Sequence, residues 1–277
     1  MPQNESFYRK NHIKIQRLSN KFRSFRDVTY DSIRDWIDQF DYAHGNLAIK
    51  ILEKVFYVDQ AKMLAAYQSV HQQLVNVCSD LSHTYFAGYG HAGSSGQAML
   101  YRYKIANKLR STPIESNFIY MSDIPNLRLV KDPVILFVDD FMGTGDKAVE
   151  LWCGQKDNEN ITRPGLQEIV PTNTKCYLGV IIAYEAGLQN IQKETPITVL
   201  PWQFFTEQDR VLSTSSAIFN DGEKRLIKEY CVRTGCSFVT GYGDTQSLVV
   251  FEHNCPNDSL PILWFESRSW RGLFPRR

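Results

Sequence analysis

Continuous apolar runs alternate with helical patterns in the middle of this 277-residue chain. Four runs contain no charged side chain: residues 84–89, 134–138, 176–184 and 197–200. Uninterrupted apolar runs are typical of parallel strands that are buried on both faces. Because strands that alternate with helices build a layered sheet, the pattern predicts an α/β fold with a parallel sheet over about residues 79–203.

The chain before this core has a helical pattern. Ile33, Trp36 and Ile37 share one face of a helix that Thr29 can cap, and Phe56–Val58 is a short extended segment before a further helix. This order is compatible with a winged helix and equally with a small helical adaptor. We therefore expect an N-terminal domain at residues 1–78, made of a basic arm and helices.

The remaining residues, 79–277, are expected to form a second domain. After the core, residues 204–266 would form a hood-like part above the ligand, and residues 267–277 a basic tail. The chain's net charge of +1 gives no overall field that favours nucleic acid or a membrane. No apolar run approaches the roughly 20 residues that span a bilayer. The N-terminus lacks an apolar signal segment and no Cys-x-x-Cys pair occurs, so we expect a cytoplasmic protein with reduced thiols and no membrane partner.

The most informative stretch begins at the apolar run 134–138. Asp139 and Asp140 follow it, and the loop Gly143-Thr144-Gly145 leads into a helical pattern. Ligands of open α/β sheets bind beyond the carboxyl ends of the strands, and a Gly-containing loop at a helix N-terminus suits a phosphate. Paired acids suit the vicinal hydroxyls of a sugar, or Mg²⁺. The stretch therefore predicts a site for a ribose 5-phosphate.

This pattern of apolar residues, two acids, two apolar residues and a small turn resembles the phosphoribosyl pyrophosphate (PRPP) motif of type I phosphoribosyltransferases. Phe141 is larger than usual, and Lys147 stands where Ser or Thr normally helps to hold the phosphate. The resemblance implies PRPP or another ribose-phosphate compound as substrate. Asp139 and Asp140 would hold the ribose hydroxyls, directly or through Mg²⁺, and would stabilise positive charge on the ribose during catalysis. The phosphate would be held by Met142, Gly143, Thr144, Gly145, Asp146 and Lys147.

A Gly- and Ser-rich loop follows the run 84–89, where phosphoribosyltransferases bind pyrophosphate. It comprises Gly90, His91, Ala92, Gly93, Ser94, Ser95 and Gly96. Only His91 can offset the charge of a leaving group there, which favours N-glycosidic cleavage of a nucleotide as an alternative to ordinary PRPP chemistry. The segment Gly88–Ser95 is also close to a Walker A motif, with 134–140 as Walker B, but it lacks the phosphate-binding Lys.

The C-terminal third ends in a distinctive pattern. Its members are Asn254, Pro256, Asn257, Leu260, Pro261, Leu263 and Trp264. With the acid pair and the N-terminal helices, this pattern resembles the phosphoribosyltransferase-like effector proteins of bacterial conflict and antiphage systems, including those encoded beside retron reverse transcriptases. The resemblance implies an effector role without fixing a substrate. We expect a nucleic-acid partner, such as retron DNA or RNA, a nucleotide-type small molecule, and a reverse transcriptase or a second copy of the chain as further partners. In this fold the hood lies above C1 of the ribose, and its base-contacting candidates are Tyr242, Asp244, His253, Asn254 and Trp264.

Basic side chains gather at both termini. They are Arg9, Lys10, Lys14, Arg17, Lys21, Arg23 and Arg26 at the start, and Arg268 and Arg271 near the end. Aromatic residues such as Phe7, Phe22 and Trp270 lie among them. Basic and aromatic side chains together are what contact with a nucleic-acid backbone and its bases needs, although a solvated arm and tail have the same composition.

Three functions therefore stand as hypotheses. The first is an enzyme effector, a glycosyltransferase or glycosidase that acts at C1 of a ribose-phosphate. The second is a catalytically silent nucleotide sensor that binds nucleic acid, as in purine repressors, which join a winged helix to such a domain. The third is a degenerate P-loop NTPase. Loss of turnover after changing Asp139 and Asp140 would favour the enzyme, and altered DNA affinity alone would favour the sensor.

Overall fold

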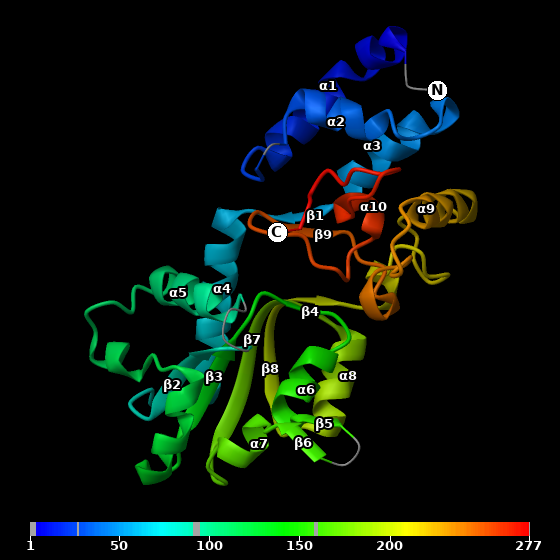
Figure 1. Cartoon of the computed structure of the whole chain (residues 1–277). Helices are drawn as coiled ribbons and strands as arrows, with labels where there is room; N and C mark the ends of the chain where they lie inside the picture. The colour runs from blue at the N-terminus through cyan, green and yellow to red at the C-terminus, as the bar shows by residue number, and fades with distance from the viewer. Residues whose placement is uncertain (1–3, 27, 91–94, 158–159, 277) are drawn as a thin grey trace. The chain divides into compact units, whose positions relative to one another are not determined.

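The structure is a computed structural model that describes residues 4–26, 28–90, 95–157 and 160–276 (Figure 1). It divides into two compact units: unit 1 is Met1–Gln60 with Glu207–Arg277, and unit 2 is Ala61–Thr206. This division differs from the expected boundary at residue 78, because apolar residues of the C-terminal segment share a core with those of the N-terminal helices. The pattern of apolar positions shows which residues are buried, but it does not show which distant segments pack together.

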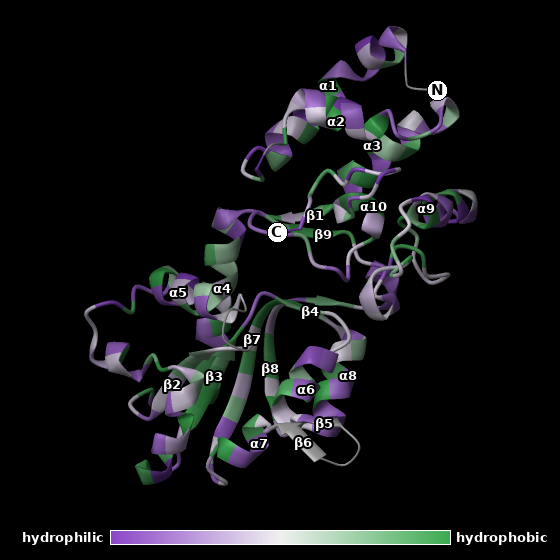
Figure 2. Ribbon diagram, in the orientation of Figure 1, coloured by the Kyte–Doolittle hydropathy of each residue, from purple (hydrophilic) through white to green (hydrophobic). Residues whose placement is uncertain are grey.

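Unit 2 confirms the predicted α/β fold with a parallel sheet. The five strands of this sheet are β2 (Thr84–Gly88), β3 (Val134–Val138), β4 (Phe141–Met142), β7 (Lys175–Tyr184) and β8 (Thr198–Phe205). β2 pairs with β3, and β3 pairs with the first half of β7, while β4 pairs further along β7. β8 pairs with the other edge of β7. The strands β3 and β7 are mainly hydrophobic, as Figure 2 shows, in keeping with a sheet covered on both faces.

Helices and short turns connect these strands. They are α4 (Gln60–Val77), α5 (Gly96–Ala106), η2 (Pro113–Asn117), η3 (Met121–Leu129), α6 (Asp146–Cys153), α7 (Leu166–Ile169) and α8 (Glu185–Glu194), with the hairpin β5 (Gln155–Asp157) and β6 (Asn160–Arg163) after α6. The short apolar stretch within residues 117–121 also predicts a strand, and this prediction is wrong. Only a single bridge, Phe86 to Phe118, forms there. The Asp123 carboxylate accepts from the Tyr120 amide and starts η3 instead of letting a strand continue.

Unit 1 combines helices with one short pair of strands. Its elements are α1 (Glu5–Phe22), α2 (Tyr30–Ile37), η1 (Tyr42–His44), α3 (Gly45–Lys54), β1 (Phe56–Val58), η4 (Glu207–Asp209), α9 (Asp221–Arg233), η5 (Tyr242–Asp244), β9 (Val249–Phe251) and α10 (Pro261–Trp264). The predicted cap of α2 is present as a reciprocal pair of hydrogen bonds between Thr29 and Ser32. Within the described part of residues 1–78, β1 is the one strand, and it pairs in parallel with β9. The antiparallel hairpin of a winged helix is therefore not formed there.

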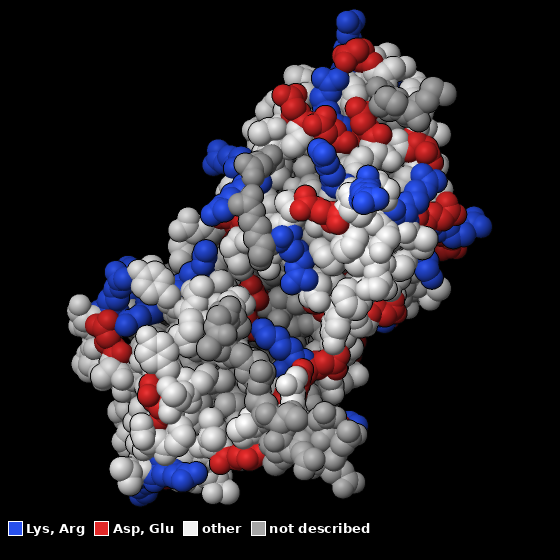
Figure 3. All heavy atoms as spheres, viewed as in Figure 1, with Lys and Arg blue, Asp and Glu red and all other residues white. Residues whose placement is uncertain are grey.

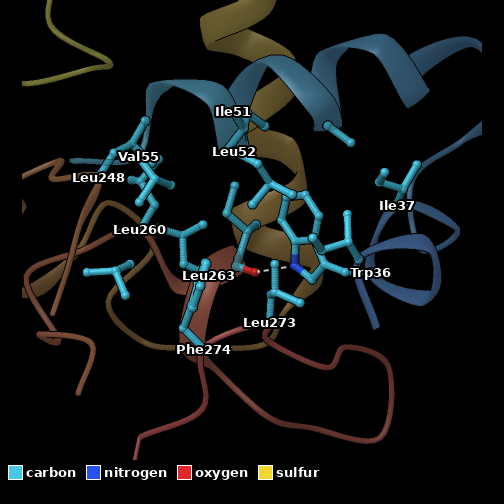
Figure 4. Close-up of a cluster of buried hydrophobic side chains, with 14 of the residues drawn as sticks. Trp36, Ile37, Ile51, Leu52, Val55, Leu248, Leu260, Leu263, Leu273 and Phe274 are labelled. Carbon is cyan, nitrogen blue, oxygen red and sulfur yellow. Dashed lines mark hydrogen bonds between the residues drawn. The ribbon is translucent and has the colours of Figure 1, made fainter. Parts of the chain in front are cut away.

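The core of unit 1 joins the two ends of the chain (Figure 4). The indole N–H groups of Trp36 and Trp270 both donate to the carbonyl oxygen of Ile262, each at 2.9 Å. Most aromatic residues of the basic termini are buried in this core: Tyr8, Phe22, Phe25, Trp270 and Phe274. These five are therefore not available to stack on bases, while Phe7 is partly buried against the same core.

Candidate functional site

The two acids lie between two strands, β3 and β4, that both pair with β7. Asp139 and Asp140 follow β3, which pairs with the start of β7, and precede β4, which pairs near its end. The Asp139 amide donates to the Gly179 carbonyl oxygen at 3.0 Å, and the amides of Ile181 and Ile182 both donate to the Asp140 carbonyl oxygen. These bonds to β7 fix the acids at the carboxyl end of β3, where a ligand site was expected.

The two carboxylates differ in their surroundings. Asp139 is only 4 % exposed, and its Oδ2 lies 3.0 Å from Nζ of Lys147. The Ser95 hydroxyl donates to its Oδ1 at 3.4 Å. Asp140 is half-buried. Neighbouring side chains of extended chain point to opposite sides, and Asp140 is the more accessible acid of the pair.

The environment of Asp139 favours its neutral form. Burial raises the pKa of its carboxyl to about 7, and the charge of Asp140 acts in the same direction. Lys147 lowers this pKa by ion pairing and hydrogen bonding. Lys147 is itself 60 % exposed, so its ammonium is accessible to an anionic ligand. A group that titrates near neutrality in a site is typical of functional positions.

This raised pKa predicts a pH-dependent stability. Between the pKa of an unfolded Asp, about 3.9, and the folded value of about 7, the unfolded chain has lost a proton that the folded chain still holds. The unfolded state then binds fewer protons, so the free energy of unfolding falls as the pH rises through this window, by up to about 1.4 kcal/mol per pH unit. Asp139→Asn should remove this slope. Urea unfolding of both proteins at several pH values, without added metal, measures it. An unchanged slope in the variant would show that Asp139 titrates normally.

The turn between β4 and α6 is shaped by glycine. Gly145 precedes α6 with a φ of 77°, a left-handed conformation that favours glycine. The first amides of a helix lack partners within the helix, so those of α6 can bind an anion. The Thr144 hydroxyl donates to Asp146 Oδ2 at 2.7 Å and accepts from the Asp146 amide at 3.3 Å. It is thus bonded to a carboxylate at the position where the resemblance expects a phosphate.

Two residues of α8 that the sequence did not single out hold this turn. The Asn190 side-chain amide donates to the Thr144 carbonyl oxygen and to Asp146 Oδ1, both at 3.0 Å. Gly187 packs so closely that a Cβ there would lie 2.3 Å from the Gly143 carbonyl oxygen. A small residue followed three positions later by Asn is common in helices, so the sequence alone gave no signal for this contact.

The Gly- and Ser-rich loop is described only at its ends, since His91, Ala92, Gly93 and Ser94 lie outside the described residues. Its two ends approach each other closely. A Cβ at Gly96 would lie 2.4 Å from the Tyr89 carbonyl oxygen, and one at Gly88 would lie 2.5 Å from the Gly96 carbonyl carbon. Through its bond to Asp139, Ser95 places the end of this loop beside the acid pair.

The hood candidates belong to unit 1 and differ in what they can offer. Trp264 is buried and donates to the Ser259 carbonyl oxygen, so it is a core residue. Asp244 forms an ion pair with Arg210 at 2.7 Å. Tyr242 is 37 % exposed, His253 lies against the Phe251 ring, and the buried Oδ1 of Asn254 has no hydrogen-bond partner among the described residues. Tyr242 and Asn254 thus keep the most capacity to contact a ligand.

The basic residues that the sequence singled out differ in their surroundings. Lys21 donates to the carbonyl oxygens of Leu52, Glu53 and Val55, so it closes the C-terminus of α3 and has a structural role. Five others are exposed: Arg9, Lys10, Lys14, Arg17 and Arg23. Arg26, Arg268 and Arg271 line one groove. Basic and acidic side chains are interspersed over the face shown in Figure 3, so charge alone marks no single patch there.

The part of the chain that the structure describes has neither a metal site made of protein side chains alone nor a membrane-spanning helix. No group of three or more His, Cys, Asp or Glu side chains in that part of the chain could hold a metal ion by itself. An Mg²⁺ ion at the acid pair would therefore need phosphate oxygens of the substrate as further ligands. Mg²⁺ is commonly bound in this way, by one or two carboxylates and phosphate oxygens. No helix among the same residues is long and apolar enough to cross a membrane.

A parallel sheet with an acid pair and a glycine-shaped turn at the end of a central strand defines a phosphoribosyltransferase-like protein. A family model described as PRTase-CE matches residues 33–276, across both units, and the chain therefore belongs to the PRTase-CE family. No curated protein and no solved structure matches the chain. The family is phosphoribosyltransferase-like and suggests a ribose-phosphate compound as the substrate class.

Proposed function

We propose that the chain acts at C1 of a ribose-phosphate compound, by transfer to an acceptor or by hydrolysis of an N-glycosidic bond. The observation that carries this proposal is the acid pair Asp139 and Asp140 next to the turn at the N-terminus of α6. The acids suit the ribose hydroxyls, and the amides of the turn suit the 5-phosphate. The family match supports the same class of function.

In this proposal the residues of the site have separate tasks. The amides of residues 142–146, with Thr144, hold the 5-phosphate, and Asp140 accepts hydrogen bonds from the ribose hydroxyls. When a phosphate arrives, Lys147 turns from Asp139 toward the phosphate, because its ammonium is exposed to an arriving anion. Asp139 loses this ion pair, and the positive charge that develops at C1 of the ribose then favours the ionised form of its carboxyl. Positive charge that develops at C1 as the bond to the leaving group breaks is stabilised by the two acids.

The leaving group would be held by another segment of unit 2. The loop from Gly90 to Gly96 is proposed to contact pyrophosphate or an equivalent group, with Ser95 at its described end beside Asp139. Mg²⁺, held by Asp140 and the substrate's phosphates, would supply positive charge to the leaving group. Within unit 1, Trp264 is committed to the core, so it is not a proposed ligand contact.

The biological setting is part of the same proposal. The C-terminal pattern that includes Asn254 and Trp264 supports an effector of a bacterial antiphage system, associated with a retron and acting in the cytoplasm. A nucleic-acid partner, a reverse transcriptase and a second copy of the chain are the proposed partners. Control by nucleic acid would explain why a cell tolerates an enzyme that consumes nucleotides.

A silent nucleotide sensor is the second candidate function. The ion pair between Lys147 and Asp139 favours it, because in the unbound protein it neutralises a carboxylate that catalysis would need. A sensor would bind the same ribose-phosphate ligand without breaking the C1 bond.

Binding and turnover together test the proposal. Calorimetry with ribose 5-phosphate and PRPP is expected to show binding, and proton NMR of the C1 position in PRPP or ribonucleoside monophosphates is expected to show cleavage. Binding without a change at C1, with and without nucleic acid present, would support the sensor. Absence of binding by every ribose-phosphate compound would reject the site itself.

A further inference from the structure

A groove of about 500 Å³ lies in unit 1. Ser32, Asp35 and Trp36 of α2 and Gln39 just after this helix form one wall, and Arg26 and residues of the segment 266–275 form the rest. Small-molecule sites in proteins have volumes of about 300–1,000 Å³, so the groove has the size of a binding site. No residue of the acid pair or of the turn before α6 lines it.

Three arginines line this groove: Arg26, Arg268 and Arg271. All three are exposed, and none of them forms an ion pair with another residue that the structure describes. A guanidinium carries several N–H donors in a planar fork that matches the oxygens of a phosphate or carboxylate. Three such groups around one groove, each without a protein counter-ion, leave their donors for an anionic ligand.

The segment that carries Arg268 and Arg271 is held in place. The Gln39 side chain donates to the Arg271 carbonyl oxygen at 2.9 Å and accepts from the Arg271 amide at 2.6 Å. The Ser267 amide donates to the Trp270 carbonyl oxygen at 2.8 Å, and the backbones of Glu266 and Arg271 form a bridge. Trp270 anchors the loop in the core through its bond to Ile262. The arginines therefore project from an ordered loop, which lowers the cost of ordering them on binding.

The lining also limits what the ligand can be. Trp36 and Trp270 line the groove but are only 1 % and 2 % exposed, so neither presents a ring face for stacking on a base. Asp35 and Glu266 place two carboxylates beside the three arginines. These acids repel an anion and restrict where a phosphate can sit, while they can accept hydrogen bonds from sugar hydroxyls. Recognition would thus depend on phosphate and sugar, and hardly on the base.

We propose that this groove is a binding site for phosphate groups, held by Arg26, Arg268 and Arg271. Two sources share this chemistry: the backbone of a nucleic acid, read without base preference, and the phosphates of a free nucleotide. The proposal does not depend on turnover at the acid pair, since no residue of that site is involved.

The double variant Arg268→Gln with Arg271→Gln tests the site in the full-length protein. Fluorescence anisotropy with a labelled single-stranded DNA of about 20 nucleotides, and calorimetry with ATP, provide the two probes. The variant is expected to bind the DNA or the ATP at least tenfold more weakly than the unchanged protein. For the DNA, the dependence of log K on log salt should also become shallower, by about 1.4 units for two lost contacts to a single strand.

A matched control loses the same charge in the same unit but outside the groove. Arg225→Gln with Lys228→Gln changes two exposed residues of α9, and it should bind like the unchanged protein. Weaker DNA binding by the groove variant, without competition by ATP, would identify the backbone as the ligand. Weaker ATP binding would identify a free nucleotide. The proposal is overturned if the unchanged protein binds neither probe at low salt, or if the groove variant binds both as well as the control does.

The variant Asp35→Asn distinguishes a phosphate ligand from a partner that binds the groove through its own cationic groups. Removing this carboxylate should tighten the binding of DNA or ATP, because it removes a like charge from the groove. Weaker binding by Asp35→Asn would mean that the groove recognises a partner's cation, and it would contradict the phosphate site.

Discussion

Asp140→Asn is expected to weaken the binding of ribose 5-phosphate by about 10- to 100-fold while the fold stays intact. A hydrogen bond to a charged acceptor contributes about 1.5–3 kcal/mol, and about 1.4 kcal/mol corresponds to a factor of ten. Asp140 is the half-buried acid of the pair, and its backbone is fixed by two amides of β7. Replacing its carboxylate with an amide therefore removes the charge without moving the chain.

The control for this variant is Glu168→Gln, which makes the same chemical change at an exposed position of α7. Calorimetry should give the unchanged affinity for the control, and thermal unfolding should give similar midpoints for all three proteins. Equal affinities for Asp140→Asn and the unchanged protein would remove Asp140 from the ribose site. The double variant Asp139→Asn with Asp140→Asn should lose measurable binding, because it removes both carboxyl groups of the acid pair.

The sheet of unit 2 could be predicted because its strands are buried on both faces and therefore have uninterrupted apolar sequences. The runs 84–89, 134–138 and 176–184 correspond closely to β2, β3 and β7. The unit boundary could not be predicted in this way. The apolar residues of α2 and of the segment around Leu263 have ordinary helical and irregular patterns, and nothing in either pattern shows that they pack against each other (Figure 4).

The candidate site was predictable where chemistry is local and unpredictable where it depends on contacts between distant segments. The acids, the turn and its glycines are consecutive, so the sequence alone predicts that they lie together. The ion pair between Asp139 and Lys147 joins residues eight positions apart across the turn, and the contacts of Asn190 join α8 to residues more than forty positions away. The basic termini show the converse error: their aromatic residues looked available for stacking, but Phe22 and Trp270 complete the core of unit 1.

The contact between α8 and the phosphate turn leads to the second large effect, which we expect for Gly187→Ala. The added Cβ would meet the Gly143 carbonyl oxygen at 2.3 Å, and backbone cannot rotate away as a side chain can. The turn must therefore shift, which should cost about 1–3 kcal/mol of unfolding free energy and weaken ribose 5-phosphate binding at least tenfold.

Gly222→Ala is the matched control, since Gly222 also lies in the first turn of a helix and its Cβ would meet only the Asn220 side chain, at 3.3 Å. That control should keep its affinity and gain up to about 1 kcal/mol, because alanine restricts the unfolded chain. Thermal unfolding and calorimetry of both variants decide the matter: if Gly187→Ala binds and unfolds like Gly222→Ala, the close packing of α8 does not shape the phosphate turn.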